Sequence, residues 1–220
     1  MKMAMNKYEL KRILLDFFFP NRCPVCNKVI GRMDYICDNC SAEFGYNEKD
    51  ESLCGGKLIS VCRYNDKTSP IVIGAKKHRD GSKISFMAYT IVKKITETYD
   101  TLPDVIVPVP LFHSDKLKKG YSHTEKICRE ITEITGIPTV NAVAKIKKTA
   151  QQKTLSRDKR QTNLKDCFAV TDAKAIDKKH ILIIDDVTTT GATLSEVYCT
   201  ITNCENCECT AIDFAVFART

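Results

Sequence analysis

The stretch that decides the fold is Ile181-Leu-Ile-Ile-Asp-Asp-Val-Thr-Thr-Thr-Gly-Ala-Thr-Leu194. Four large aliphatic residues without polar alternation predict a strand buried on both faces of a parallel sheet. Two carboxylates follow where the apolar run stops, and then a loop of small residues leads into a helix-like pattern. Small side chains let backbone N–H groups converge, and a helix N-terminus adds partial positive charge, so the loop suits a phosphate. The carboxylates suit hydroxyls or a divalent cation. Together these features indicate a sugar phosphate.

The same stretch resembles the phosphoribosyl-pyrophosphate (PRPP) motif of type I phosphoribosyltransferases. It lacks the Lys of a P-loop and the Gly-x-Gly spacing of a dinucleotide-binding fold, so neither of those motifs fits. The resemblance implies an α/β protein with the type I phosphoribosyltransferase fold, a mostly parallel sheet flanked by helices. The alternative is an ordinary strand-to-helix turn that happens to hold two Asp and several Thr residues.

Length and composition are compatible with an α/β domain and a small appendage. The chain has 220 residues, is 43% hydrophobic and 28% charged, and carries a formal net charge of +7. The positive charge favours phosphates or nucleic acid as ligands. No stretch approaches the ~20 apolar residues that span a membrane. Because twelve cysteines occur without an export signal, we expect a reduced, cytoplasmic protein with no membrane insertion.

Four cysteines near the N-terminus have metal-ligand spacing. Cys23 and Cys26 form one Cys-x-x-Cys pair, and Cys37 and Cys40 form a second pair after ten intervening residues. Four thiolates fit one tetrahedral zinc and leave no open position, so we expect a structural zinc. An iron–sulfur cluster or a redox dithiol pair is the alternative. A second metal site is conceivable at a later, cramped cluster that consists of Cys199, Cys204, Cys207 and Cys209.

Periodicity predicts the remaining elements and two domains. A composition change near residue 55 indicates a module over residues 1–55, which begins with a short amphipathic helix at 10–18, and a main domain over 56–220. Strands are expected over residues 57–64, 103–110, 139–146, 167–170 and 210–218. One helix is expected over 82–99 with Ser82 as N-cap, and another from the capping box Ser122-x-x-Glu125 to Gly136.

Two basic segments could serve a phosphate ligand. Lys76 and Lys77 precede the first of these helices, where they lie either beside the phosphate site or in a solvated turn. The stretch 145–165 is rich in Lys and Arg and poor in apolar residues. It is therefore either a loop that orders over a polyanion or a solvated basic surface.

The order of parts along nearly the whole chain is similar to the ComF family of competence proteins. After the four-cysteine module come Val107-Pro-Val-Pro-Leu111, the segment Lys119-Gly-Tyr-Ser-His123 and the PRPP motif. Between the last two lies a block that contains Gln152, Leu155, Arg160, Asn163 and Phe168. The chain departs from the family at Ser122 and His123, where Asn-Gln is usual. We expect His123 either to contact a ligand or to lie exposed in the capping turn.

This resemblance implies a PRPP site with magnesium. Asp185 and Asp186 would be catalytic, holding the ribose hydroxyls and, through PRPP, Mg²⁺. The loop from Thr189 to Thr193 would bind the 5-phosphate. The implied PRPP-binding residues are Asp185, Asp186, Thr188, Thr189, Thr190, Gly191, Ala192, Thr193, Lys76, Lys77, Pro110 and Arg160.

The resemblance also implies a biological setting, DNA uptake during natural transformation. It predicts a PRPP-binding, phosphoribosyltransferase-like protein that handles incoming single-stranded DNA in the cytoplasm, with a competence helicase-like partner. The sequence does not reveal an acceptor for the ribosyl group, so turnover is left open. The alternative is a metabolic phosphoribosyltransferase of nucleotide synthesis or salvage without a nucleic-acid role.

Overall fold

The computed structural model describes residues 20–31, 33–78, 80–112, 120–147 and 165–220. The predicted N-terminal helix at 10–18, Arg160 and most of the basic stretch 145–165 lie outside these ranges. None of the described helices is both long and apolar enough to cross a membrane.

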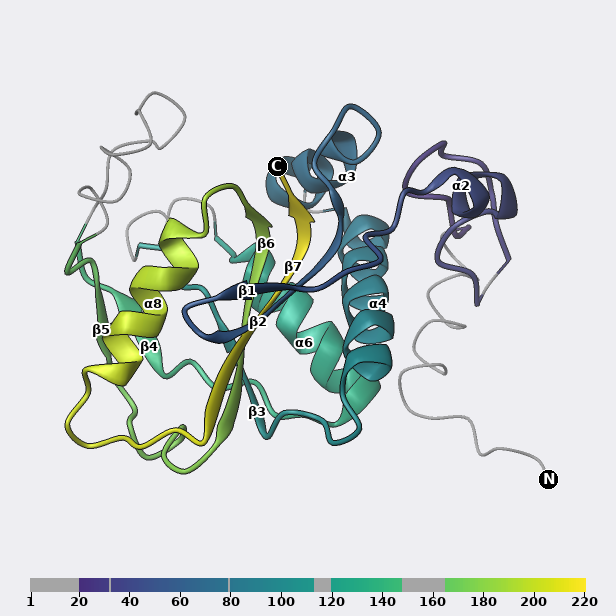
Figure 1. Ribbon diagram of the computed structural model, residues 1–220. Helices are drawn as coiled ribbons and strands as arrows, with labels where there is room; N and C mark the ends of the chain where they lie inside the picture. The colour runs from purple at the N-terminus through teal and green to yellow at the C-terminus, as the bar shows by residue number, and fades with distance from the viewer. Residues whose placement is uncertain (1–19, 32, 79, 113–119, 148–164) are drawn as a thin grey trace.

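A five-stranded sheet in the order β1-β2-β7-β6-β3 forms the centre of the molecule (Figure 1). The hairpin of β1 (Glu51–Leu53) and β2 (Gly56–Arg63) is antiparallel. The other neighbours, β7 (Ala211–Arg219), β6 (His180–Thr188) and β3 (Val105–Pro108), all run parallel to β2. The mostly parallel sheet predicted from the sequence is confirmed.

Helices cover both faces of this sheet. On one face lie α4 (Gly81–Thr98) and α6 (His123–Thr135), and on the other lies α8 (Ala192–Thr202) (Figure 1). A second, two-stranded sheet of β4 (Val143–Lys145) and β5 (Phe168–Val170) packs on the α8 side.

The aliphatic residues of β6 belong to two hydrophobic cores, one on each face of the sheet. Leu182 and Ile184 belong to the core under α4 and α6, whereas Ile181 and Ile183 belong to the core under α8. All four side chains are fully buried, because successive strand residues point to opposite faces and both faces are covered. This explains why the run lacks polar alternation.

Some predicted boundaries are wrong in detail. The N-cap of α4 is Asp80 rather than Ser82, and its Oδ1 accepts the N–H groups of Ser82 and Lys83 at 3.1 and 3.4 Å. A carboxylate at this position also complements the positive helix end. Before it, the chain forms α3 (Ser69–Ile73) and the π-turn η1 (Gly74–His78). The predicted caps of α6 are confirmed, since Ser122 Oγ accepts the N–H of Glu125 and Gly136 ends the helix with φ of 79°.

The N-terminal module gathers four thiols. The Sγ atoms of Cys23, Cys26, Cys37 and Cys40 all lie within 4.8 Å of one another. The first pair sits on a turn closed by the N–H of Asn27 donating to the carbonyl of Cys23 at 2.8 Å, and the second begins α2 (Asp38–Glu43). Cys26 and Cys37 Sγ atoms are 3.7 Å apart. Two thiolates on a tetrahedral zinc with bonds of about 2.3 Å would be about 3.8 Å apart. The four residues therefore fit one structural zinc.

Aromatic side chains attach this module to the main domain. Tyr35 stacks on Tyr89 of α4 with ring centroids 4.0 Å apart, and Phe44 meets Phe86 edge-on at 5.3 Å. Phe44 is itself part of the core under α4. The predicted division into 1–55 and 56–220 falls inside the β1–β2 hairpin and stays a prediction.

Gly191, the N-cap of α8, provides a test of the turn between β6 and α8. Its φ is +79°, and a Cβ there would lie 2.9 Å from Leu53 Cδ1. We expect Gly191→Ala to lower the free energy of unfolding by about 1–2 kcal/mol, because an L-residue is strained in the left-handed region. Urea denaturation followed by circular dichroism measures this. Gly45→Ala is the control, since nothing lies within 4 Å of its Cβ position; equal losses in both variants would contradict the expectation.

The zinc assignment predicts about one zinc per chain in purified protein. We expect Cys23→Ser combined with Cys26→Ser to remove the metal and make the module sensitive to limited proteolysis, because a small module relies on its metal to fold. Elemental analysis and proteolysis follow the two effects. Cys54→Ser, an exposed thiol outside the cluster, should keep the zinc. Iron in place of zinc, or full zinc content in the double variant, would refute the assignment.

Candidate functional site

The candidate site lies where β6 and β3 end. Pro108 pairs with Ile184, and the N–H of Val109 donates to the carbonyl of Ile184 at 2.9 Å. Pro110 follows directly and is half-buried. In open α/β sheets, ligands bind at this carboxyl edge of the strands. The predicted Val-Pro-Val-Pro loop is thereby brought beside the acidic pair.

The acidic pair lies within β6 rather than after its end, which corrects the sequence-based expectation. Asp185 and Val187 still pair with β7, and β6 continues to Thr188, opposite Arg219. The aliphatic run stops earlier than the strand because the acids replace apolar residues at the rim, where the core ends. The strand therefore fixes the acids rigidly.

Asp186 is the most constrained group of the site. Only 3% of the residue is exposed, and its Oδ2 lies 2.6 Å from Lys76 Nζ and 2.9 Å from His123 Nε2. Its Oδ1 accepts the N–H of Val187 at 2.7 Å. Lys76 comes from η1 and His123 is the first residue of α6, so three separate elements meet at one carboxylate.

The two acids have opposite pKa shifts. Burial favours the protonated form of Asp186, but the ammonium of Lys76 and the hydrogen bond from His123 outweigh it and hold the pKa of Asp186 well below its usual range. Burial, and then the charge of Asp186, raise the pKa of Asp185 to about 8. The charge of Asp186 also raises the pKa of Lys76, against the opposing effect of burial. At neutral pH, Asp186 is therefore ionised and paired, while Asp185 retains its proton.

Tyr121 holds the turn that carries Lys76. Its Oη lies 2.5 Å from the carbonyl oxygen of Ala75 and 3.0 Å from that of Lys76, and Lys126 lies over its ring at 4.8 Å. Tyr121 thus links the segment before α6 to η1, so that Lys76 and His123 are positioned together.

His123 corrects the sequence-based expectation. It is not an exposed capping residue, because its side chain is 9% exposed and its Nε2 lies 2.9 Å from Asp186 Oδ2. The other expectation, that His123 contacts a ligand, stays a prediction. Sequence reasoning missed the contact with Asp186, and also the role of Tyr121. The only feature of the sequence that could have indicated this contact is the position of His123 at the start of a predicted helix, at the end of the segment Lys119-Gly-Tyr-Ser-His123.

The phosphate loop is the turn from β6 into α8. The carbonyl of Thr188 accepts the N–H of Thr220 at 3.1 Å, which anchors the end of the strand. Thr189 is exposed, and the N–H of Ala192 reaches Thr190 Oγ1 at 3.4 Å. The N-terminal end of α8, with its partial positive charge, follows this loop directly, as an anion site requires.

The predicted PRPP residues come from several elements, most of which begin or end at this edge of the sheet. The structure brings Lys76 to the acids, whereas Lys77 on the same turn is exposed. Arg160 lies outside the described residues. The placements are Asp185, Asp186 and Thr188 on β6, Thr189, Thr190 and Gly191 in the turn, Ala192 and Thr193 in the first turn of α8, and Pro110 after β3.

The later cysteines do not form a metal cluster. Among the residues that the structure describes, only the N-terminal four bring three or more possible ligand atoms together. The second metal site conceivable from Cys199, Cys204, Cys207 and Cys209 is therefore not formed.

Comparison with protein families agrees with this architecture. The phosphoribosyl transferase domain model matches residues 80–219, and the double zinc ribbon domain model matches residues 14–57. The first covers more than half of the chain and contains the acidic pair and the phosphate loop. The second contains the four clustered cysteines.

Relatives match most of the chain. Competence protein F from Haemophilus influenzae is 27% identical over 80% of this chain and 81% of its own. The DNA utilization protein YhgH from Escherichia coli K12 is 26% identical with the same coverage. Among solved structures, adenine phosphoribosyltransferase from Leishmania tarentolae is 12% identical, with a TM-score of 0.40 over 69% of this chain and 74% of its own. The chain thus belongs to the phosphoribosyl transferase domain family, and its N-terminal zinc ribbon and curated relatives identify it as a member of the ComF type.

Proposed function

We propose that the chain binds PRPP together with Mg²⁺ at the carboxyl edge of β6 and acts in DNA uptake, where it handles incoming single-stranded DNA in the cytoplasm. The observation that carries the proposal is the acidic pair on β6, in which Asp186 is paired with Lys76 and which is followed directly by the turn into α8. The names of the relatives, competence protein F and DNA utilization protein, support the DNA-uptake setting.

The residues of the site suit the parts of PRPP. Hydroxyls of the ribose would bind the carboxyl groups of Asp185 and Asp186, and the 5-phosphate would bind the Thr189–Thr193 loop through backbone N–H groups. Lys76 is 40% exposed although it pairs with Asp186, so its ammonium is accessible to a pyrophosphate. Pairing with Lys76 also keeps the site from being purely acidic, which would repel a phosphate ligand.

The acids also fit the expected magnesium ion. Carboxylate oxygens are the hard donors that Mg²⁺ prefers, and Asp185 is less engaged than Asp186 by neighbouring cations. When bound, the ion supplies positive charge that neutralises the pyrophosphate. Asp185 must lose its proton to contribute as a carboxylate, so we expect it to be the acid that couples binding to pH. The proposed function is the binding of PRPP, with no acceptor for the ribosyl group.

Isothermal titration calorimetry tests the PRPP site. We expect PRPP to bind in the presence of Mg²⁺, and Asp185→Asn combined with Asp186→Asn to abolish that binding, because the double variant removes both carboxylates. Asp100→Asn, an exposed acid just beyond α4, is the matched control and should bind as the wild type does. Normal PRPP affinity in a folded double variant would show that the site is wrongly assigned.

Single-stranded DNA separates the proposed function from a metabolic phosphoribosyltransferase. We expect an oligonucleotide to bind at low ionic strength and to weaken steeply with salt, since phosphate contacts release counterions. Fluorescence anisotropy measures this, and the double Asp variant should bind the DNA unchanged. If PRPP binds and DNA does not, the metabolic alternative is favoured and the direct role in DNA handling is lost.

The raised pKa of Asp185 predicts pH-dependent binding. Below about pH 8 a proton competes with the cation, so the affinity for PRPP with saturating Mg²⁺ should fall by up to tenfold per pH unit, and it should level off above pH 8. Titrations between about pH 7 and 9 avoid the phosphate pKa near 6. Asp185→Asn should flatten the profile. A flat profile in the wild type would exclude Asp185 as the titrating ligand.

A further inference from the structure

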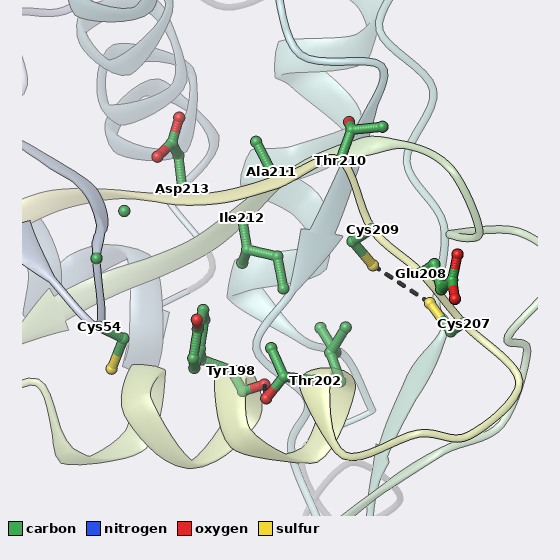
Figure 2. Close-up of a pocket in the computed structure, with 13 residues that line it drawn as sticks. Cys54, Tyr198, Thr202, Cys207, Glu208, Cys209, Thr210, Ala211, Ile212 and Asp213 are labelled. Carbon is green, nitrogen blue, oxygen red and sulfur yellow. Dashed lines mark hydrogen bonds between the residues drawn. The ribbon is translucent and has the colours of Figure 1, made fainter.

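A cavity lies beside α8, away from the acidic pair, and Figure 2 shows residues that line it. It measures about 610 Å³ and is bounded by α8, the β1–β2 turn and the start of β7. The first residues of β7 pair with the first residues of β6, so this is the amino edge of the parallel strands. Three thiols line the cavity, those of Cys54, Cys207 and Cys209.

Two of these thiols are in direct contact. Figure 2 shows the side chains of Cys207 and Cys209 turned toward each other, and their Sγ atoms are 3.2 Å apart. This is closer than the 3.7 Å of Cys26 and Cys37 in the zinc cluster and farther than the roughly 2.05 Å of a disulfide bond. Within the described part of the chain, no further group joins the pair to complete a set of three ligands. The spacing therefore favours bond formation between the sulfurs over a shared metal ion.

Backbone hydrogen bonds hold the Cys-x-Cys turn in place. The N–H of Glu208 donates to Asp177 Oδ1 at 2.9 Å, and its carbonyl accepts the N–H of Lys178 at 2.9 Å. The thiol of Cys209 donates to the carbonyl of Ile176 at 3.5 Å. Because both the N–H and the carbonyl of Glu208 are hydrogen-bonded, the turn holds the two thiols close together.

We propose that Cys207 and Cys209 form a reversible redox site that reduces a small-molecule disulfide entering this cavity. The cavity has the volume of a small-ligand site, and both thiols form part of its wall. The proposal does not rest on PRPP binding, since Cys207 and Cys209 lie just before the start of β7, at the edge of the sheet opposite the acids.

The proposed reaction is a thiol–disulfide exchange between the two cysteines and the small disulfide, and it needs no other reactant. The thiolate of Cys207 attacks one sulfur of the small disulfide, which releases one small thiolate and leaves a mixed disulfide on Cys207. The thiol of Cys209 then loses its proton and attacks Cys207 Sγ, which releases the second small thiolate. The two cysteine protons end on the two small thiols, so the protein loses two hydrogens and the small disulfide gains them.

Two observations set the order of attack and the reversibility. Burial and the hydrogen bond with Cys207 raise the pKa of Cys209 to about 12, so Cys209 keeps its proton longer and acts second. Both cysteines line the open cavity, so small thiols can reach a disulfide between them, as a switchable rather than a structural disulfide requires.

The test uses the full-length, zinc-loaded protein in buffers with graded ratios of reduced to oxidised glutathione. Samples are quenched with acid, free thiols are alkylated, and the peptide that contains residues 207–209 is weighed. As the buffer becomes more oxidising, we expect the peptide with two alkylated thiols to be replaced by a peptide with a disulfide bond. That peptide is two hydrogens lighter than the reduced, unalkylated peptide. Excess dithiothreitol should reverse the change, and the zinc content should stay constant throughout.

Single substitutions provide the controls. Cys207→Ser and Cys209→Ser should each prevent the change, with the remaining thiol either alkylated or carrying glutathione. Cys54→Ser should leave it intact. The proposal is overturned if both thiols of the wild type remain alkylated in fully oxidised glutathione. It is also overturned if the wild type stops at a mixed disulfide, or if it binds a second zinc that Cys207→Ser removes.

Discussion

The structure of the site depends on one buried negative charge. Asp186 is almost fully enclosed, and a carboxylate without partners in such a place would cost several kcal/mol. Lys76 and His123 supply the partners, and each is delivered by a different element. The positions of η1, the start of α6 and the end of β6 are therefore coupled. Tyr121 strengthens that coupling by bonding the backbone of η1 from the segment that precedes α6.

The negative charge of Asp186 also affects the pKa of Asp185. Asp185 is adjacent in the strand, and the charge of Asp186 adds to burial in raising its pKa. One acid is thus ionised and paired with Lys76, while burial and the neighbouring charge favour the protonated form of the other. In the proposed PRPP site, this arrangement would leave less negative charge than two ionised carboxylates, which favours a phosphate ligand. Loss of the proton from Asp185 would then provide a carboxylate for the proposed cation.

The two ends of the sheet are built for different chemistry. The carboxyl edge carries the acids and the phosphate loop, whereas at the amino edge Asp213 accepts hydrogen bonds from Tyr99 Oη at 2.7 Å and the N–H of Lys57 at 2.6 Å. Its contact with His180 Nε2 at 2.9 Å joins β6 to the same network. The N-terminal module packs against α4 through stacked and edge-on aromatic rings, which join it to the main domain.

The sequence by itself determined the features that depend on neighbouring residues. The unbroken aliphatic run at 181–184 indicated a strand buried on both faces, the small-residue turn indicated a phosphate loop, and the spacing of four cysteines indicated one zinc cluster. Each follows from local periodicity or spacing. Only the tertiary structure decided which distant groups meet. His123 and Lys76 reach Asp186, and the thiols of Cys207 and Cys209 come into contact, because chain folding, rather than any local pattern, sets those distances.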